Sequence, residues 1–293
     1  RRFRRDQGER IRAWLADQCD EINKKLSWVE QVHLDTPNPA VRPGYVPDEF
    51  LEGPPMPPAP ARFSLGVRLL AKLLPALRER VLREGLRAEA EYREAVAGFE
   101  RRRSEHQEKE RARRVFIEEE IVSNDDAMAE FLEEQLSAME WPRETLISHD
   151  IREAGSLVIA DIDLPEIEDL PTRTATVASR GLKLSIKELS PARLRQLYVR
   201  HVHGVLFRVI GGIFASLPTC KEVVASGFSQ RRDPATGHER EEYLLSVRVQ
   251  RTGWEGLNFD SLESVDVAGA LAEFELRREI ARDGSLSAVS PIV

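Results

Sequence analysis

Cysteine is nearly absent from this chain, which has two cysteines among 293 residues. Cys19 and Cys220 stand far apart and lack the spacing of a metal-binding or redox pair. Structural disulfides are common in secreted domains and rare in reducing compartments. We therefore expect no structural disulfide and a protein that works in a reducing cytoplasm.

Long apolar runs are also missing. The most apolar stretch, residues 190–218, is interrupted by charged and polar residues, among them Arg200, His201, His203 and Arg208. It is therefore not a membrane span, which needs about 20 predominantly apolar residues. The first residues, RRFRRDQGERIR, contain no apolar core of a signal peptide. We expect a cytoplasmic protein that has no membrane partner.

Positive charge is not in excess, since 43 lysines and arginines face 50 aspartates and glutamates, for a formal net charge of −7. This balance argues against binding of nucleic acid by the whole surface and leaves only local basic patches. Charged residues make up 32% of the chain, above the typical share of about 25%. The excess lies before residue 150, where the pattern predicts charged helices.

Known catalytic motifs are absent as well. No serine stands in a Gly-x-Ser-x-Gly nucleophile motif. His201 and His203 point to different sides of a helix, whereas a zinc pair needs i,i+4 spacing. Gly211 and Gly212 follow no strand, so we interpret them as a place of close packing between a helix and the sheet rather than as a phosphate loop. We expect no catalytic residue and no cofactor.

The central element is a helix predicted from Ser190 to Pro218. Ser190 is a good N-cap, Pro191 suits the first helical position, and Pro218 ends the helix. Apolar residues form one broad face, and the arginines fall mostly elsewhere around the helix. The apolar positions are Leu194, Leu197, Val202, Val205, Leu206, Val209, Ile210, Ile213 and Phe214, and the arginines are Arg193, Arg195, Arg200 and Arg208.

Strand patterns flank this helix, and a second helix is predicted over residues 267–280, before a terminal strap. The fold class is therefore α+β, with long N-terminal helices joined by a proline-rich strap, then a small mixed or antiparallel sheet packed on one long helix. The predicted strands cover residues 145–150, 156–165, 172–177, 182–186, 221–230 and 241–250, with a hairpin loop at 233–239.

We divide the chain into an N-terminal helix (1–34), a proline-rich linker (35–64), a long charged helical region (65–120) and an α+β domain (121–293). The prolines exclude a regular helix from the linker, and we interpret it as an extended connector. Two alternatives stay open. One is a ligand for a proline-recognition domain, and the other is a strap packed on a neighbouring domain through Tyr45, Phe50 and Phe63.

Arginines and glutamates are interleaved in the region 65–120, which Pro75 kinks or divides. This pattern predicts a solvated helix face with ion pairs at i,i+4 spacing. The alternative is a strip of arginines that contacts a DNA backbone. A third helix is expected from a cap at Asn124 or Asp125 to Met139, with inward residues Ala127, Phe131, Leu132 and Leu136.

Two sets of residues are candidates for function. Asp161 and Asp163 share a predicted strand, and carboxylates on strands hold Mg²⁺ in metal-dependent nucleases. A restriction-type nuclease also needs a later (Asp or Glu)-x-Lys on a strand, which the sheet region lacks, so a structural role is the favoured interpretation. The second set is basic and would contact nucleic acid: Arg173, Arg180, Lys183, Arg193, Arg195 and Arg200.

Several stretches occur together in a characteristic order: PPAPARF, FIEEEIVSNDDAMAEFLEEQLSAMEWP, SLVIADIDLPEIEDLPTRTATV, LRQLYVRHVHGVLFRVIGGIF, a DPATG hairpin and the ending LSAVSPIV. In this order the chain resembles the N-terminal, non-catalytic region of bacterial restriction endonucleases of the Mrr-like type. It departs from that pattern at TRTATVASRG, where a lysine-bearing segment is usual, and at VDVAGALAEF.

The resemblance implies a component of a prokaryotic anti-phage defence or restriction system. The chain would act as an assembly, targeting or partner-docking module, and a partner chain or a further domain would supply the nuclease. We expect other subunits of a defence complex as partners, in a homo- or hetero-oligomer held by helical, coiled-coil contacts, with DNA as a further candidate. The alternatives are an atypical Mg²⁺-dependent nuclease using Asp161 and Asp163, and a nucleic-acid sensor.

Overall fold

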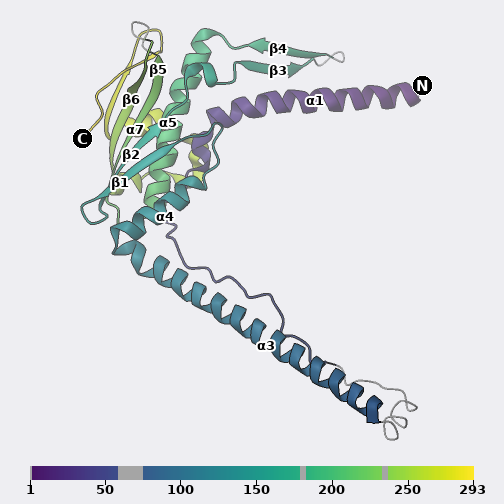
Figure 1. Ribbon diagram of the computed structural model, residues 1–293. Coiled ribbons are helices and arrows are strands. Elements are labelled where there is room, and N and C mark those ends of the chain that lie inside the picture. Colours follow the sequence, from purple (N-terminus) through teal and green to yellow (C-terminus); the bar gives the residue numbers. More distant parts are fainter. Residues whose placement is uncertain (1, 59–74, 179–182, 233–236) are drawn as a thin grey trace. The chain divides into compact units, whose positions relative to one another are not determined.

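The computed structural model describes residues 2–58, 75–178, 183–232 and 237–293 (Figure 1). They form two compact units, residues 1–43 with 119–293, and residues 44–118. The predicted α+β class is confirmed, because helices and two sheets both occur in this part of the chain. The helices are α1 (Arg2–Glu30), α3 (Pro75–Glu118), α4 (Asp125–Ser137), α5 (Pro191–Ser216), α6 (Arg251–Trp254) and α7 (Val267–Ala272), with short 3-10 turns at Val32–Asp35, Glu120–Val122, Ile167–Asp169 and Phe259–Ser264.

The main sheet of the described residues has six strands in the order β1-β2-β5-β6-β7-β8. β2 and β5 are parallel and are joined through α5, while the remaining neighbours are antiparallel. The strand predicted over residues 145–150 is present as β1 and pairs with β2. The strands are β1 (Ile147–Arg152), β2 (Leu157–Asp163), β5 (Glu222–Arg232), β6 (Glu239–Gln250), β7 (Glu275–Ile280) and β8 (Leu286–Ser287). Residues 233–236 of the hairpin loop lie outside the described residues.

Helix α5 is the centre of the core and runs along one face of the sheet (Figure 1). Its start is as predicted, since Ser190 Oγ accepts from the backbone N–H of Arg193 at 3.3 Å. The apolar face is wider than predicted, because every residue from 201 to 214 is buried. We had predicted that Arg208 lies on a polar face of the helix. It is inside the core instead. Neighbouring elements cover α5 on several sides, which a single-helix pattern does not reveal.

The predicted helix over residues 267–280 is wrong in its second half. α7 ends at Ala272, and Glu275–Ile280 forms β7 instead. β7 pairs with β6, for example Leu276 with Val247. Arginine and glutamate favour a helix locally, but the open edge of β6 offers backbone partners, and such tertiary context overrides propensity. The terminal strap then crosses the face of the sheet turned away from α5, where the N–H of Ile292 donates to Ser246 Oγ at 2.9 Å.

A separate two-stranded sheet, β3 (Arg173–Val177) with β4 (Leu184–Glu188), packs beside α1 (Figure 1). Asn23 of α1 binds the backbone of Ala175 in both directions. Its side-chain nitrogen donates to the carbonyl oxygen, and its side-chain oxygen accepts from the N–H, each at 2.9 Å. One side-chain amide thus replaces a neighbouring strand and satisfies this backbone edge. Arg180, in the loop between the two strands, lies outside the described residues.

Gly211 and Gly212 of α5 allow close packing. We had predicted that they pack against the sheet, but their neighbours lie elsewhere. A Cβ on Gly211 would collide with the Thr36 methyl group, and one on Gly212 with the end of the Met139 side chain. α4 covers this side of α5 and is capped as expected, with Asn124 accepting from the N–H of Asp126 at 2.9 Å. The predicted inward residues of α4, Ala127, Phe131, Leu132 and Leu136, are all buried.

The second unit consists of α3 and the segment from Gly44, which lies along the helix in an extended conformation. Glu110 accepts from the Tyr45 hydroxyl at 2.6 Å and from the N–H of Asp48 at 2.8 Å. The Phe50 ring lies 5.7 Å from that of Phe99. The strap alternative thus describes this segment better than a free connector does, although its third anchor, Phe63, lies outside the described residues.

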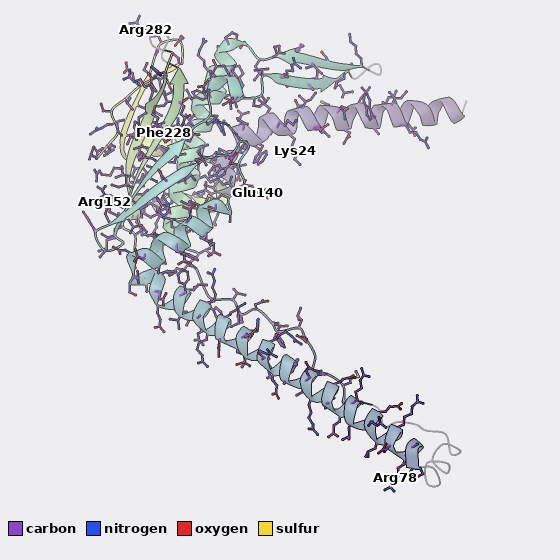
Figure 2. The ribbon with its side chains drawn as sticks, in the orientation of Figure 1. Lys24, Arg78, Glu140, Arg152, Phe228 and Arg282 are labelled. Atoms are coloured by element: carbon purple, nitrogen blue, oxygen red, sulfur yellow. The ribbon has the colours of Figure 1, made fainter. Side chains whose placement is uncertain are left out.

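Arginine–glutamate pairs at i,i+4 spacing line α3, as predicted. Arg80 and Glu84 are 3.1 Å apart, and Arg87 and Glu91 are 2.9 Å apart. Figure 2 shows the side chains that project from this helix along its length. Residues 65–74, which we had assigned to the same helical region, lie outside the described residues. None of the described helices is long and apolar enough to cross a membrane.

Candidate functional site

Asp161 and Asp163 lie on the same face of β2, turned away from α5, while Ile162 between them is buried in the core. Burial, together with the charge of Asp161 and a hydrogen bond to it, raises the pKa of Tyr243. Partial burial and the negative charge of Asp169 raise the pKa of Asp163, while Arg143 opposes this change. The neighbours of the two carboxylates therefore differ, although both side chains lie on the same face of β2. Asp161 lies near Tyr243, and Asp163 lies near Arg143 and Asp169.

A magnesium ion prefers several oxygen ligands. Within the described parts of the chain, no group of three or more histidine, cysteine, aspartate or glutamate side chains is placed to hold a metal ion. The structure thus supplies two carboxylates on one strand and no third ligand from the described residues. The magnesium site remains a prediction that rests on this pair alone.

The structure describes five of the six predicted basic residues, all except Arg180, and their partners differ. Arg173 is paired across the small sheet with Glu188 at 2.7 Å. Arg193 and Arg200 share Glu30 of α1, at 2.8 and 3.7 Å. The remaining two differ: Arg195 donates to the carbonyl oxygen of Asp283 at 2.6 Å, and Lys183 is exposed beside β4. Contact with nucleic acid by these residues stays a prediction, and acidic partners compete with a phosphate at three of them.

The two α5 histidines are core residues. Burial lowers the pKa of His201 and that of His203 to about 4, so both rings are neutral near pH 7. His201 Nδ1 lies 2.8 Å from the carbonyl oxygen of Val29 and donates to it. His203 Nε2 accepts from Arg278 at 2.7 Å. These bonds hold the two rings in place within the core.

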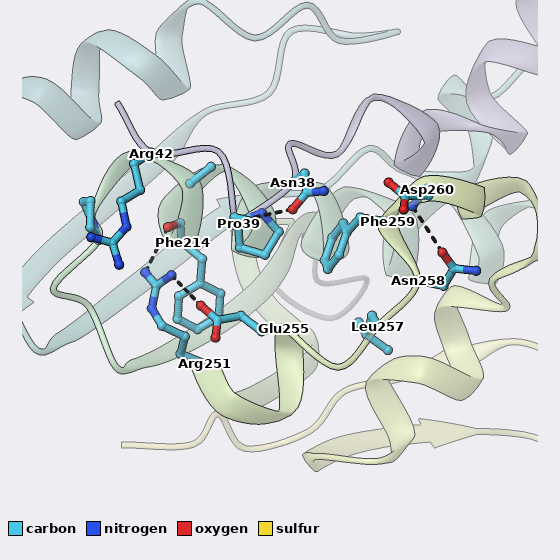
Figure 3. A pocket seen from close by; sticks show the side chains of 13 residues that line it. Asn38, Pro39, Arg42, Phe214, Arg251, Glu255, Leu257, Asn258, Phe259 and Asp260 are labelled. Carbon is cyan, nitrogen blue, oxygen red and sulfur yellow. Dashed lines mark hydrogen bonds and ion pairs between the residues drawn. The ribbon is translucent and has the colours of Figure 1, made fainter. Parts of the chain in front are cut away.

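Two grooves border the C-terminal half of α5. The first, of about 700 Å³, is lined by residues 38–42, the end of α5 and residues 251–260 (Figure 3). Arg42 and Arg251 are its cations. Arg251 stacks on the Phe214 ring, with 4.7 Å from guanidinium carbon to ring centroid. Figure 3 shows the guanidinium beside this ring, with a dashed line to the Glu255 carboxylate.

Arg251 caps α5. It donates to the carbonyl oxygens of Phe214 at 2.9 Å and Leu217 at 2.6 Å, and also to that of Cys220. The last carbonyl groups of a helix have no partner within the helix, and basic side chains commonly satisfy them. The donors of Arg251 are thus occupied by the protein, and the other cation of this groove, Arg42, is exposed to solvent.

The second groove, of about 810 Å³, contains Arg208 together with Trp28, Val41, Phe131 and Met139. Sequence patterns missed this arginine, because the helical wheel placed it on a polar face. A signal was present nonetheless, since Arg208 is the one charged residue between His203 and Pro218. A single charge inside a long apolar helical stretch is rarely buried without a partner or a function.

Comparison of the chain with models of known families, with curated proteins and with solved structures finds no match.

The second unit offers a different kind of surface. Leu82 and Leu86 are adjacent on one side of α3, four residues apart, and their exposed fractions are 63% and 58%. Phe99 is buried beneath the strap, whereas these leucines have no such cover among the described residues. Glu79–Arg83 and Arg80–Glu84 ion pairs lie alongside them. Apolar side chains flanked by charges of both signs are typical of helices that associate.

Proposed function

We propose that this chain is a docking and assembly component of a prokaryotic anti-phage defence system, without a catalytic centre of its own. The defence assignment is supported by the order of motifs shared with Mrr-like restriction endonucleases. The docking role is supported by one structural observation, the exposed Leu82–Leu86 pair on α3. The cytoplasm is the proposed location, and other subunits of the defence complex are the proposed partners.

The first partner that we propose for α3 is the α3 of a second copy. A helix of 44 residues extends about 66 Å at 1.5 Å per residue, and most of its surface is exposed. Charges of both signs alternate along it, so a second α3 meets opposite charges in either direction. The leucine pair then supplies the apolar contact that such a charged surface otherwise lacks.

The test is the mass of the purified chain, measured by size-exclusion chromatography with light scattering. We expect a dimer or larger assembly, and a shift to the monomer in the double variant Leu82→Glu, Leu86→Glu. Leu146→Glu is the matched control, since Leu146 is an equally exposed leucine in the other unit. A monomeric parent chain, or a double variant with unchanged mass, would contradict the proposal.

An atypical nuclease is the second candidate, because Asp161 and Asp163 share one face of β2. Incubation of the chain with phage DNA and Mg²⁺ tests it. Cleavage that disappears in the variant Asp161→Ala, Asp163→Ala supports the nuclease and contradicts a purely docking role. No cleavage by the parent chain rejects the nuclease.

A further inference from the structure

The groove at Arg208 holds a charge that the protein leaves largely unsatisfied. The side chain of Arg208 is only 7% exposed, and its pKa is lowered because burial disfavours the cation. An arginine carries five N–H donors. Nη1 donates to the carbonyl oxygen of Glu140 at 2.6 Å, whereas the buried Nε has no hydrogen-bond partner among the described residues.

No carboxylate makes a close ion pair with this guanidinium in the described structure. The nearest, Asp35, lies 3.9 Å from Nη2, beyond hydrogen-bonding distance, and its side chain is 61% exposed. The Trp141 ring covers one face of the guanidinium at 4.7 Å. Burying a charge costs several kcal/mol unless close partners compensate. Arg208 therefore gains from any anion that reaches its free edge.

The neighbouring groove provides a comparison within the same molecule. Arg251 is also largely buried, but three backbone carbonyls and Glu255 accept from it. Arg251 is thus a structural cation, whereas Arg208 makes one hydrogen bond and lines an open groove. Arg208 and Arg251 therefore differ in the number of hydrogen bonds that their guanidinium groups make, whereas both side chains are largely buried.

The other residues of the groove define the ligand. Trp28, Val41, Phe131 and Met139 present apolar surface, and the volume of about 810 Å³ is within the usual range for small-molecule sites. The two arginines of the groove, Arg208 and Arg42, face two carboxylates, Asp35 and Glu140, so the lining has no net positive charge to favour a dianion. A carboxylate matches the planar edge of an arginine and brings a single charge.

We propose that this groove binds a small monocarboxylate with an apolar, ring-sized body, and that its carboxylate pairs with Arg208. The apolar body then contacts Trp28 and Met139. This inference goes beyond the proposed docking function and does not depend on it, because no residue of the second unit is involved.

Calorimetric titration of the whole chain tests the site with three probes. They are 2-naphthoate, the neutral 2-naphthalenemethanol and the dianionic 2-naphthyl phosphate. We expect 2-naphthoate to bind at least about tenfold more tightly than the alcohol, because a charge-assisted hydrogen bond contributes about 1.5–3 kcal/mol. Equal affinity for the carboxylate and the alcohol, no binding of 2-naphthoate, or tighter binding of the phosphate would overturn the proposal.

Variants at exposed positions locate the site without disturbing the core. Asp35→Asn removes a competing carboxylate and should tighten 2-naphthoate binding about two- to fivefold, the effect of one solvent-screened charge. Val41→Glu adds such a charge and should weaken it. Glu279→Gln, an exposed change outside the groove, is the control and should have no effect. Tighter binding of 2-naphthoate to Asp35→Asn together with weaker binding to Val41→Glu supports the site. Unchanged affinity in both variants rejects it.

Arg208→Gln should abolish the preference for 2-naphthoate over the alcohol. If this core variant fails to fold, the two exposed variants still decide the question. A short peptide ending in a phenylalanine carboxylate, compared with its amide, separates a free small molecule from a chain terminus. Tighter binding of the peptide than of 2-naphthoate would reject the small-molecule assignment.

Discussion

At the residue scale, the buried polar side chains of α5 differ in whether they carry a charge in the core. His201 and His203 remain neutral and donate or accept within the core. Arg208 remains a cation and is stacked on Trp141 with one strong hydrogen bond. From their spacing we predicted that the two histidines do not share a metal ion, and the structure places both rings in the core. Sequence patterns did not identify Arg208, because its burial depends on α4 and residues 35–43, which lie far away in the sequence.

The buried histidines predict a dependence of stability on pH. His201 titrates near pH 4 in the folded chain and near 6.5 when unfolded, so the unfolded chain binds more protons between these values. Its contribution to stability is therefore complete above pH 6.5 and is lost as the pH falls towards 4. His203 behaves in the same way. Each histidine steepens the loss by at most about 1.4 kcal/mol per pH unit.

The check is urea unfolding of the parent chain and of His201→Asn between pH 4 and 7. Asparagine retains a donor for the carbonyl oxygen of Val29 but does not titrate. We expect a shallower decline of the free energy of unfolding with falling pH in this variant. His238→Asn, at an exposed position, should follow the parent chain. Identical slopes for the parent and His201→Asn would show that the buried ring does not control the decline.

At the element scale, α5 was well predicted at its ends and poorly predicted around its circumference. Ser190 and Pro218 are local signals, and local capping chemistry fixes where a helix begins and stops. Which sides of α5 are covered depends on the sheet, α4, and residues 32–43, and a helical wheel does not contain this information. β7 was missed for the same reason, because its partner β6 lies 30 residues earlier in the chain.

The two adjacent glycines of α5 should respond differently to alanine. At Gly211 the new methyl group meets Thr36, which is buried and whose hydroxyl donates to the carbonyl oxygen of His33 at 2.6 Å. At Gly212 it meets the flexible end of Met139. Alanine gains about 1 kcal/mol over glycine inside a helix, and overpacking costs about 1–3 kcal/mol.

We therefore expect Gly211→Ala to lower the free energy of unfolding by up to about 2 kcal/mol. Gly212→Ala should leave it unchanged or raise it by up to about 1 kcal/mol. Chemical denaturation of both single variants beside the parent chain measures the difference. Equal changes in the free energy of unfolding at the two positions would mean that residues 36–37 move aside as easily as the side chain of Met139.

At the scale of the whole molecule, the α+β class followed from periodicity and turn residues, and the structure confirms it. The division into units depended on long-range contacts. α1 and residues up to Pro43 belong with the sheet, whereas residues 44–118 form a unit of their own. Sequence patterns likewise located only those candidate sites whose residues lie close together in the chain. Asp161 and Asp163 were placed on one strand from their alternation, but the groove at Arg208 is assembled from segments that no local pattern connects.

The exposed side chains of Leu82 and Leu86 allow a direct test of the association through α3 that we propose. Cys19 and Cys220 are both buried, so a cysteine introduced at an exposed position is labelled selectively. Arg78 is exposed and lies one turn before Leu82. A spin label at Arg78→Cys therefore reports on this part of α3 without occupying the apolar contact itself.

Pulsed electron–electron dipolar spectroscopy on this labelled chain tests the docking role most directly. If α3 meets the α3 of a second copy, labels on two copies produce a defined dipolar modulation. That modulation weakens on dilution with unlabelled chain and disappears when Leu82→Glu and Leu86→Glu are added. The absence of any modulation between copies, or a modulation that survives both glutamates, would contradict association through the leucine pair.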